Sequence, residues 1–126
     1  MSVDFVMCTR NVEEDKFGND PGATQYLFVP EEALPAPSHA KPAREWVEAV
    51  VAQATVSHNA AGGPVGDILF FVHGYASGPE ELMARHRLLQ KSLSELGYKG
   101  VVLSFDWPSE DSALAYVEDR IDARQT

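Results

Sequence analysis

Five consecutive apolar residues, Ile68 to Val72, lead directly into His73-Gly74. A continuous apolar run of this length predicts a strand buried on both faces, as in a parallel sheet covered by helices. The following segment has apolar residues and a histidine at alternating steps of four and three, which is typical of one helix face. These residues are Leu82, His86, Leu89, Leu93 and Leu96. Gly97 then favours a left-handed helix end.

A second apolar strand is predicted at Val101 to Phe105, before Asp106-Trp107-Pro108. Ser109 opens a third predicted helix, with Leu114, Val117 and Ile121 on one side. Strands alternating with helices at this spacing favour an α/β fold with right-handed crossovers. We therefore expect a three-layer α/β/α arrangement.

The first half of the chain is less regular. Two short strands are predicted, Val3 to Cys8 and Tyr26 to Val29, joined by a loop at 11–24 that contains several turn-forming residues. A proline-containing loop at 34–42 precedes a helix. Residues 58–66 are predicted to interrupt the regular secondary structure. The residues expected on the helix face are Trp46, Val47, Val50, Val51 and Ala54. We expect one domain over 1–126, made of an N-terminal part (1–66) and a part containing the apolar strands (67–126).

Charge and cysteine usage exclude several classes of protein. Ten Lys and Arg against nineteen Asp and Glu give a net charge of -9. An acidic surface repels phosphate, so neither nucleic acid nor an anionic membrane is the expected partner. Cys8 is the single cysteine of the 126 residues, which excludes an internal disulfide and a multi-cysteine metal site. No cofactor is expected, and neither a signal peptide nor a membrane-spanning apolar stretch is apparent, so the sequence predicts a cytoplasmic domain.

The turn at His73-Gly74 is the sharpest candidate for chemistry. Ligands of open α/β sheets bind outside the carboxyl ends of the strands. Gly74 has no Cβ, so the backbone can bend there and aim amide groups at a ligand. Backbone N–H groups arranged in this way form an oxyanion hole, which stabilises the negative oxygen of an acyl-transfer transition state.

This part of the chain resembles a bacterial α/β-hydrolase family of largely unassigned function. The resemblance rests on Phe71-Val72-His73-Gly74-Tyr75 and on Ser104-Phe105-Asp106-Trp107-Pro108-Ser109, separated by the predicted helix. Cys8-Thr9-Arg10-Asn11 and Lys16-Phe17-Gly18 match more loosely, since the usual order in the family is Thr-Asn-Arg. The resemblance implies an α/β-hydrolase sheet, an ester-like small-molecule substrate, and an oxyanion loop at His73, Gly74 and Tyr75 with the Tyr75 N–H as a donor.

The resemblance also implies a nucleophile elbow, Gly-x-Ser-x-Gly, followed by an acid and a histidine. That pentapeptide does not occur in the sequence, because Ser77 and its neighbouring glycines have the wrong spacing. The chain therefore looks like the N-terminal half of such a hydrolase, inactive alone. The nucleophile strand would pair with 68–72, so we expect an uncharged sheet edge there that favours self-association or binding of the missing half.

Structural alternatives stand beside these roles. His73 could brace its loop by hydrogen bonds, and Tyr75 could simply pack over the site. Ser77 has the spacing of a helix cap with Glu80, and His86 is expected in the core. The other residues weighed are Asp106, explained equally by a turn, and His39 and His58, which are in loops without ligand spacing. As a whole, the chain could instead be an interaction module that binds a partner through its strand edge. A nucleotide-binding role is weaker, because no phosphate-loop motif is present.

Overall fold

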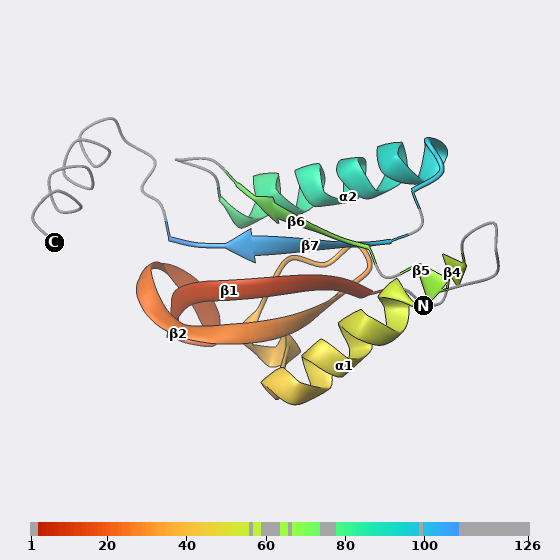
Figure 1. The fold of residues 1–126 in the computed structure, drawn as a ribbon. Coiled ribbons are helices and arrows are strands. Elements are labelled where there is room, and N and C mark those ends of the chain that lie inside the picture. Colours follow the sequence, from red (N-terminus) through yellow and green to blue (C-terminus); the bar gives the residue numbers. More distant parts are fainter. Residues whose placement is uncertain are drawn as a thin grey trace, which may run out of the picture.

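The computed structural model describes residues 3–55, 57–58, 64–65, 67–73, 78–98 and 100–108. Its main sheet has five strands in the order β3-β2-β1-β7-β6, with α2 on one face and α1 on the other (Figure 1). The three-layer α/β/α prediction is confirmed. The strands are β1 (Val3–Glu13), β2 (Lys16–Pro30), β3 (Ala40–Lys41), β6 (Ile68–Val72) and β7 (Val101–Asp106). The helices are η1 (Pro37–His39), α1 (Ala43–Ala54) and α2 (Pro79–Glu95), and β4 (Ser57–His58) pairs with β5 (Pro64–Val65).

The predicted loop at 11–24 is wrong, because most of it belongs to a long antiparallel hairpin of β1 and β2. Glu14 and Asp15, both with positive φ, make the turn. Two register shifts, on either side of Arg10, let the turn-forming residues of β2 stay in an extended strand. The predicted break at 58–66 also contains a small hairpin, β4 with β5, and the predicted loop at 34–42 contains η1 and β3.

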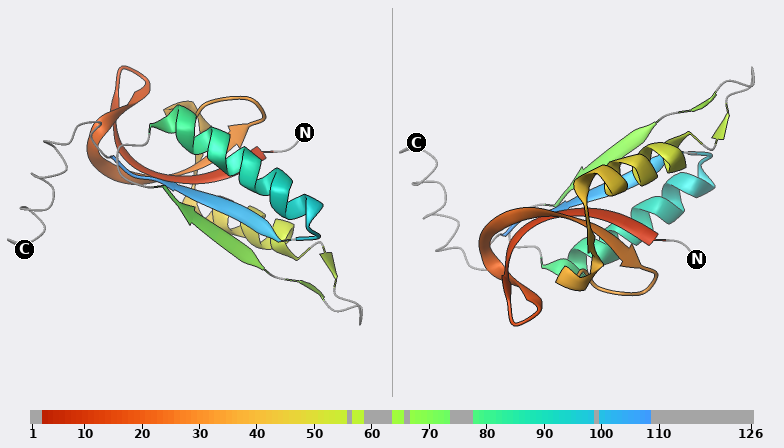
Figure 2. Two further views of the ribbon diagram at one scale, coloured as in Figure 1. Left: turned by 90° about the horizontal axis from the view of Figure 1, so that it is seen from above. Right: turned by 90° about the horizontal axis from the view of Figure 1, so that it is seen from below.

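β1, β7 and β6 are mutually parallel, and the connection from β6 to β7 passes through α2. β6 pairs with β7 and lies at the edge of the sheet, as predicted. Its expected burial on both faces is wrong, since Ile68 is 47% exposed, Phe70 45% and Val72 55%. Both helices pack on the middle strands of the sheet, so a strand with one neighbour keeps much of its surface in water (Figure 2).

The sequence placed both helices correctly but overestimated their apolar faces. On α1 only Trp46, Val50 and Ala54 are buried, whereas Val47 and Val51 are about half exposed. The buried residues of α2 are Leu82, Met83 and His86, and Leu96 is 84% exposed.

The ends of α2 give one confirmation and one correction. The N-cap residue is Gly78 rather than Ser77, which lies outside the described residues, and a glycine has no side chain with which to cap the helix. A cap must directly precede the first helical residue. The first helical residue is Pro79, whose fixed φ suits the first turn, so the cap position falls on Gly78. Gly97 has φ +92°, the left-handed conformation predicted for it. The third helix predicted from Ser109 lies outside the described residues.

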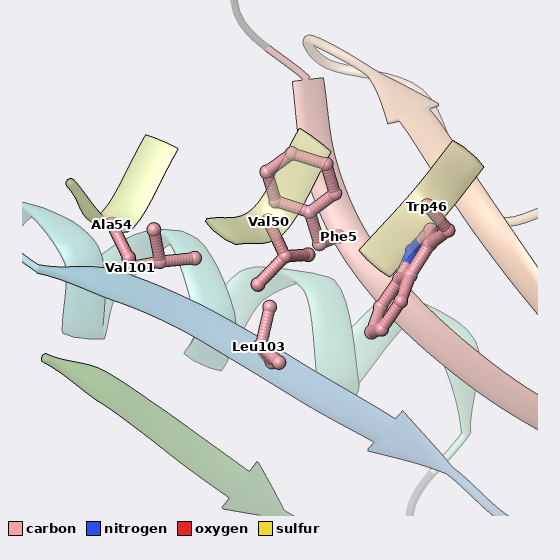
Figure 3. Packing of buried hydrophobic residues seen from close by; sticks show 6 residues of the cluster. All are labelled: Phe5, Trp46, Val50, Ala54, Val101 and Leu103. Carbon is pink, nitrogen blue, oxygen red and sulfur yellow. The ribbon is translucent and has the colours of Figure 1, made fainter. Parts of the chain in front are cut away.

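The strands alternate side chains between two cores. On the α1 face, Phe5 of β1 and Leu103 of β7 pack against Trp46 and Val50 (Figure 3). Trp46 also donates from Nε1 to the carbonyl of Leu27 at 3.0 Å, which satisfies its buried polar atom. On the α2 face, the packed residues are Val6, Cys8, Leu27, Val29, Leu82 and Met83.

Candidate functional site

Three polar side chains meet at the carboxyl edge of the parallel strands. Asp106 ends β7, His73 directly follows β6, and Arg10 lies in β1 just after Cys8, whose register partner is Asp106. All three are at least 97% buried. Parallel strands end at the same edge of a sheet, so residues far apart in the sequence are brought together here.

Arg10 and Asp106 form a buried ion pair, with Nε to Oδ1 at 2.8 Å. The guanidinium also donates to the hairpin, at the Gly18 carbonyl (3.3 Å) and Asn19 Oδ1 (3.0 Å). A further bond runs to the carbonyl of Trp107 at 3.2 Å. A buried charge is tolerated where it is paired and hydrogen-bonded in this way. Arg10 therefore fixes the hairpin and the segment after β7 to the same point.

His73 is held against Trp107 close to this pair. The two rings are stacked, with centroids 5.0 Å apart and planes 4° from parallel. The indole Nε1 donates to the carbonyl of His73 at 3.1 Å. His73 Nε2 lies 3.1 Å from the carbonyl and 3.2 Å from the amide nitrogen of Trp107, so either tautomer has a backbone partner. It is also 3.7 Å from Asp106 Oδ1. The strand end that precedes Gly74 is thus fixed by Trp107.

Cys8 lies beside the same carboxylate, with Sγ 3.9 Å from Asp106 Oδ2. Burial, reinforced by the negative charge of Asp106, raises the pKa of the Cys8 thiol to about 12. Since the thiolate is the nucleophilic form of cysteine, burial and the neighbouring carboxylate disfavour a nucleophilic role for Cys8. Cys8 is a free and buried thiol.

A second polar group lies further along the same face of the sheet. His86 of α2 makes a short hydrogen bond through Nδ1 to Ser104 Oγ, and its Nε2 lies 3.6 Å from Asp4 Oδ1. Arg87 donates from Nε to Asp4 Oδ2 at 2.9 Å and from Nη2 to the carbonyl of Ala33 at 2.7 Å. Burial acts to raise the pKa of Asp4, but interactions with His86 and Arg87 outweigh it and hold that pKa below its ordinary value.

The order Asp4, His86, Ser104 resembles a catalytic relay in its residue types. Ser104 and His86 are fully buried, however, and α2, to which His86 belongs, packs over β7, so no substrate atom could reach the hydroxyl of Ser104. The group instead attaches α2 to β1 and β7. His86 is therefore a core residue, as predicted.

Of the three residues predicted for the oxyanion loop, His73 is found at the carboxyl end of β6. Gly74 and Tyr75 lie outside the described residues, and Ser77 does too. Asp106, for which a turn was an equal explanation, is an ion-pair partner. His39 accepts a hydrogen bond at Nδ1 from the Ala36 amide at 3.1 Å, within the segment around η1. His58 falls in β4.

Sequence reasoning gave no role to Arg10 or Asp4. A signal was available: Asp4, Val6, Cys8 and Arg10 recur at every second residue, so both charges share the face of two buried residues. A charged side chain on the buried face of a strand requires a partner, although the sequence alone does not identify that partner.

Among the described residues, no group of three or more His, Cys, Asp or Glu side chains is placed to hold a metal ion. No helix in the described part of the chain has the length and apolarity needed to cross a membrane.

Comparison with known proteins bears on the half of the chain that contains β6, α2 and β7. A family profile described as alpha/beta hydrolase of unknown function (DUF900) matches residues 48–126. No curated protein and no solved structure matches the chain. The profile covers more than half of the sequence and includes β6, the His73 that follows it, and the segment from Asp106 to Pro108. The chain therefore belongs to the DUF900 family of α/β hydrolases.

Proposed function

We propose that this chain is the N-terminal portion of a serine-hydrolase-type, esterase- or lipase-like enzyme, and that it contributes the oxyanion loop at His73, Gly74 and Tyr75. The nucleophile, acid and catalytic histidine would lie outside the chain. The observation that carries the proposal is His73, which stands at the carboxyl end of a parallel strand in a hydrolase-family chain and is held at its ring and at its carbonyl by Trp107. On sequence grounds we place the enzyme in the cytoplasm.

The proposed chemistry needs a turn that does not move when charge develops. In an acyl transfer, the carbonyl oxygen of the substrate becomes negative, and amide donors already aimed at it stabilise the transition state. Here the Tyr75 N–H would be one donor, and Gly74 would provide the bend. Trp107, Arg10 and Asp106 act as positioning residues, because their bonds fix the chain where the bend begins.

The absence of a nucleophile elbow gives the first test. Treatment of the 126-residue chain with a fluorophosphonate is expected to leave no covalent adduct, since the sequence contains no Gly-x-Ser-x-Gly motif that would expose a serine nucleophile. Intact-mass analysis is the readout. A stoichiometric adduct on Ser77 would contradict the proposal, because the chain would then carry its own nucleophile.

The second test addresses the loop in an intact hydrolase that contains this sequence. Gly74→Val places a β-branched side chain at the bend and is expected to lower kcat by about 10²–10³-fold, the usual effect of losing one oxyanion donor. Val47→Ala, at an exposed position of α1, is the matched control. An unchanged kcat for Gly74→Val would mean that this turn has no such role.

A second candidate function, a non-catalytic module that binds a partner through β6, is favoured by one observation. β6 forms the edge of the sheet, Leu69 is 37% exposed, and no charged residue interrupts the strand. Next to it, Phe71 lines a groove of about 290 Å³ together with Leu88 and Leu89 of α2. Uncharged apolar edges accept an additional strand.

Sedimentation of the 126-residue chain tests this association. Dimers or larger species at about 100 µM are expected from an open edge of this kind. Leu69→Lys or Phe71→Lys should disrupt them, because a charge would be buried in the contact. A stable monomer whose Ile68–Val72 amides exchange freely with solvent would exclude a partner on this edge.

A further inference from the structure

The backbone of β6 has one side that its own sheet does not use. In the described part of the chain β6 pairs only with β7, and it lies at the outer edge of the sheet (Figure 2). The Val101 amide donates to the Asp67 carbonyl at 3.0 Å. Alternate residues of a parallel strand direct both backbone groups to the same neighbour, so Leu69 and Phe71 face β7 as Asp67 does. The remaining residues of β6 direct their N–H and C=O groups away from the sheet. These outward residues are Ile68, Phe70 and Val72.

The side chains along this edge are apolar on both faces of the sheet. Those of the outward residues lie on the α1 face, because two of their register partners in β7 are Val101 and Leu103, which pack against α1. About half of the surface of each outward residue is exposed. On the α2 face, Leu69 is partly exposed, and Phe71 lines the groove beside α2. A strand added to β6 would therefore gain hydrogen bonds and apolar contacts together.

The outward residues are arranged symmetrically about Phe70. A two-fold axis normal to the sheet at Phe70 makes the β6 strands of two copies antiparallel. Phe70 of one copy then lies opposite Phe70 of the other, and Ile68 lies opposite Val72. Each opposed pair exchanges two hydrogen bonds, so every outward backbone group obtains a partner. A slip of one residue would instead place outward groups against groups that face β7, and a slip of two would lose one of the pairs. The edge of β6 is thus complementary to itself in one register.

Charge acts on such a contact only at a distance. No charged residue lies within Ile68–Val72, so two copies oppose no like charges along the strand. Each copy nevertheless carries a net charge of -9, and two such molecules repel each other as they approach. Salt screens this repulsion over a distance of about 10 Å at 0.1 M and leaves the apolar contacts in place. Association through β6 should therefore become stronger as salt is added.

We propose that the partner of β6 is a second copy of this chain, bound as an antiparallel strand with Phe70 opposite Phe70 of the partner subunit. Two five-stranded sheets then form one continuous sheet. This inference rests on the second candidate function and names its partner and its register. On the α1 face Ile68 contacts Val72 of the partner subunit, and on the α2 face Leu69 lies opposite Phe71 of the partner subunit.

Cysteine cross-linking of the 126-residue chain tests the register. In a Cys8→Ala background, which removes the native thiol, Phe70→Cys places one thiol opposite the other, with Cα atoms about 5.5 Å apart and within disulfide range. Leu69→Cys is the matched control, because its two Cα atoms would lie about 7–8 Å apart on a diagonal. Mild oxidation at about 100 µM should give at least about fivefold more linked dimer for Phe70→Cys than for Leu69→Cys. An equimolar mixture of Leu69→Cys and Phe71→Cys chains should cross-link as well.

Hydrogen exchange of the wild-type chain gives a second readout that needs no substitution. The amides of Leu69 and Phe71 face β7 and should be protected at every protein concentration. The amides of Ile68, Phe70 and Val72 should gain protection only as the dimer forms, between about 5 and 200 µM. Raising NaCl from about 0.05 to 0.5 M should lower the dissociation constant several-fold, measured by sedimentation. A dissociation constant that rises with salt would contradict the proposal, because charged contacts would then hold the dimer.

The outcomes separate this inference from the functions proposed above. If the chain associates through β6 but Leu69→Cys cross-links as well as Phe70→Cys, the register falls and the edge remains a binding surface. If the chain stays monomeric and the outward amides exchange freely at about 200 µM, both the dimer and the edge-binding function fall. Neither result bears on the oxyanion turn, which Gly74→Val tests in the intact hydrolase.

Discussion

The two faces of the sheet are built from the same strands but are held to their helices by different interactions. On the α1 face, β1 and β7 present Phe5, Val101 and Leu103 to an apolar helix stripe. On the α2 face, the alternate residues of the same strands include Asp4, Arg10, Ser104 and Asp106, all buried. Among the described residues, every buried charged side chain lies on the α2 side or at its carboxyl edge.

This difference has an energetic consequence. Apolar contacts depend little on the relative orientation of the side chains, and their free energy depends on the area and volume that are buried. Buried charges stabilise the fold only when each partner is in place, and removing one partner leaves the other unpaired. The α1 face therefore stabilises the fold through apolar burial. The α2 face also fixes α2 and the hairpin in one position, because its charged contacts are directional. The proposed site lies at the edge of the face that specifies position.

The largest effect is expected from Asp106→Ala, which leaves Arg10 buried without its counter-charge. We expect a loss of about 3–5 kcal/mol in the free energy of unfolding, measured by urea denaturation. Arg10→Met combined with Asp106→Ala removes both charges and should recover part of that loss. If the double variant is no more stable than the single one, the pair is not what determines stability at this edge.

Next comes Leu103→Ala on the α1 face, with an expected loss of about 2–5 kcal/mol from lost burial and a residual cavity. Leu103 contacts apolar residues, so the loss should be the same at pH 7 and in mild acid. Urea midpoints at the two pH values provide the comparison. A strongly pH-dependent loss would show that the two faces are coupled.

Asp4→Asn should have an intermediate effect, about 1.5–3 kcal/mol at neutral pH, the range for hydrogen bonds to a charged group. The pKa of Asp4 is lower in the folded chain than in the unfolded one. Its stabilisation is therefore present above the unfolded pKa, about 3.9, and is lost as the pH falls through the folded value. The variant should have a flatter acid limb in a plot of unfolding free energy against pH. An unchanged acid limb would contradict this role for Asp4.

Smallest of all should be the effect of the ion pairs exposed on the helices. Arg44 pairs with Glu48 on α1, and Arg85 pairs with Glu81 on α2, both across one helical turn. Glu48→Gln and Glu81→Gln should each change the unfolding free energy by less than about 0.5 kcal/mol. These variants are controls for the comparison, since they alter charge on both sides without touching buried pairs. A larger loss of unfolding free energy for Glu81→Gln than for Glu48→Gln would mean that charge, rather than burial, distinguishes the two faces.

The parts of the fold that could be predicted from sequence are those with unbroken or periodic apolar patterns. β6, α2 and β7 are of this kind. The hairpin could not be predicted, because residues such as Pro21 and Gly22 normally make turns, and here the register shifts near Arg10 accommodate them in β2. Exposure of β6 was also missed, since an apolar run does not reveal how many neighbours the strand has.

For the site, sequence placed His73 at the end of its strand but gave no role to Arg10. The reason is distance along the chain: Arg10 and Asp106 are separated by 96 positions, and neither carries a local signal for the other. Only the parallel pairing of β1 with β7 brings them together. The charged residue on a buried strand face was the available hint, and its partner required the fold.

The rate at which the Cys8 thiol reacts with a labelling reagent reports how often the sheet opens around β1. With its pKa raised to about 12 and its side chain fully buried, the thiol is protected both chemically and sterically while β1 stays paired. A maleimide can label it only after β1 separates from its neighbours or from α2. Because Cys8 is the single cysteine of the chain, the labelling rate under native conditions reports one event at one place. That labelling rate would rise if the hairpin opens locally and separates from the Arg10–Asp106 edge before the chain unfolds as a whole.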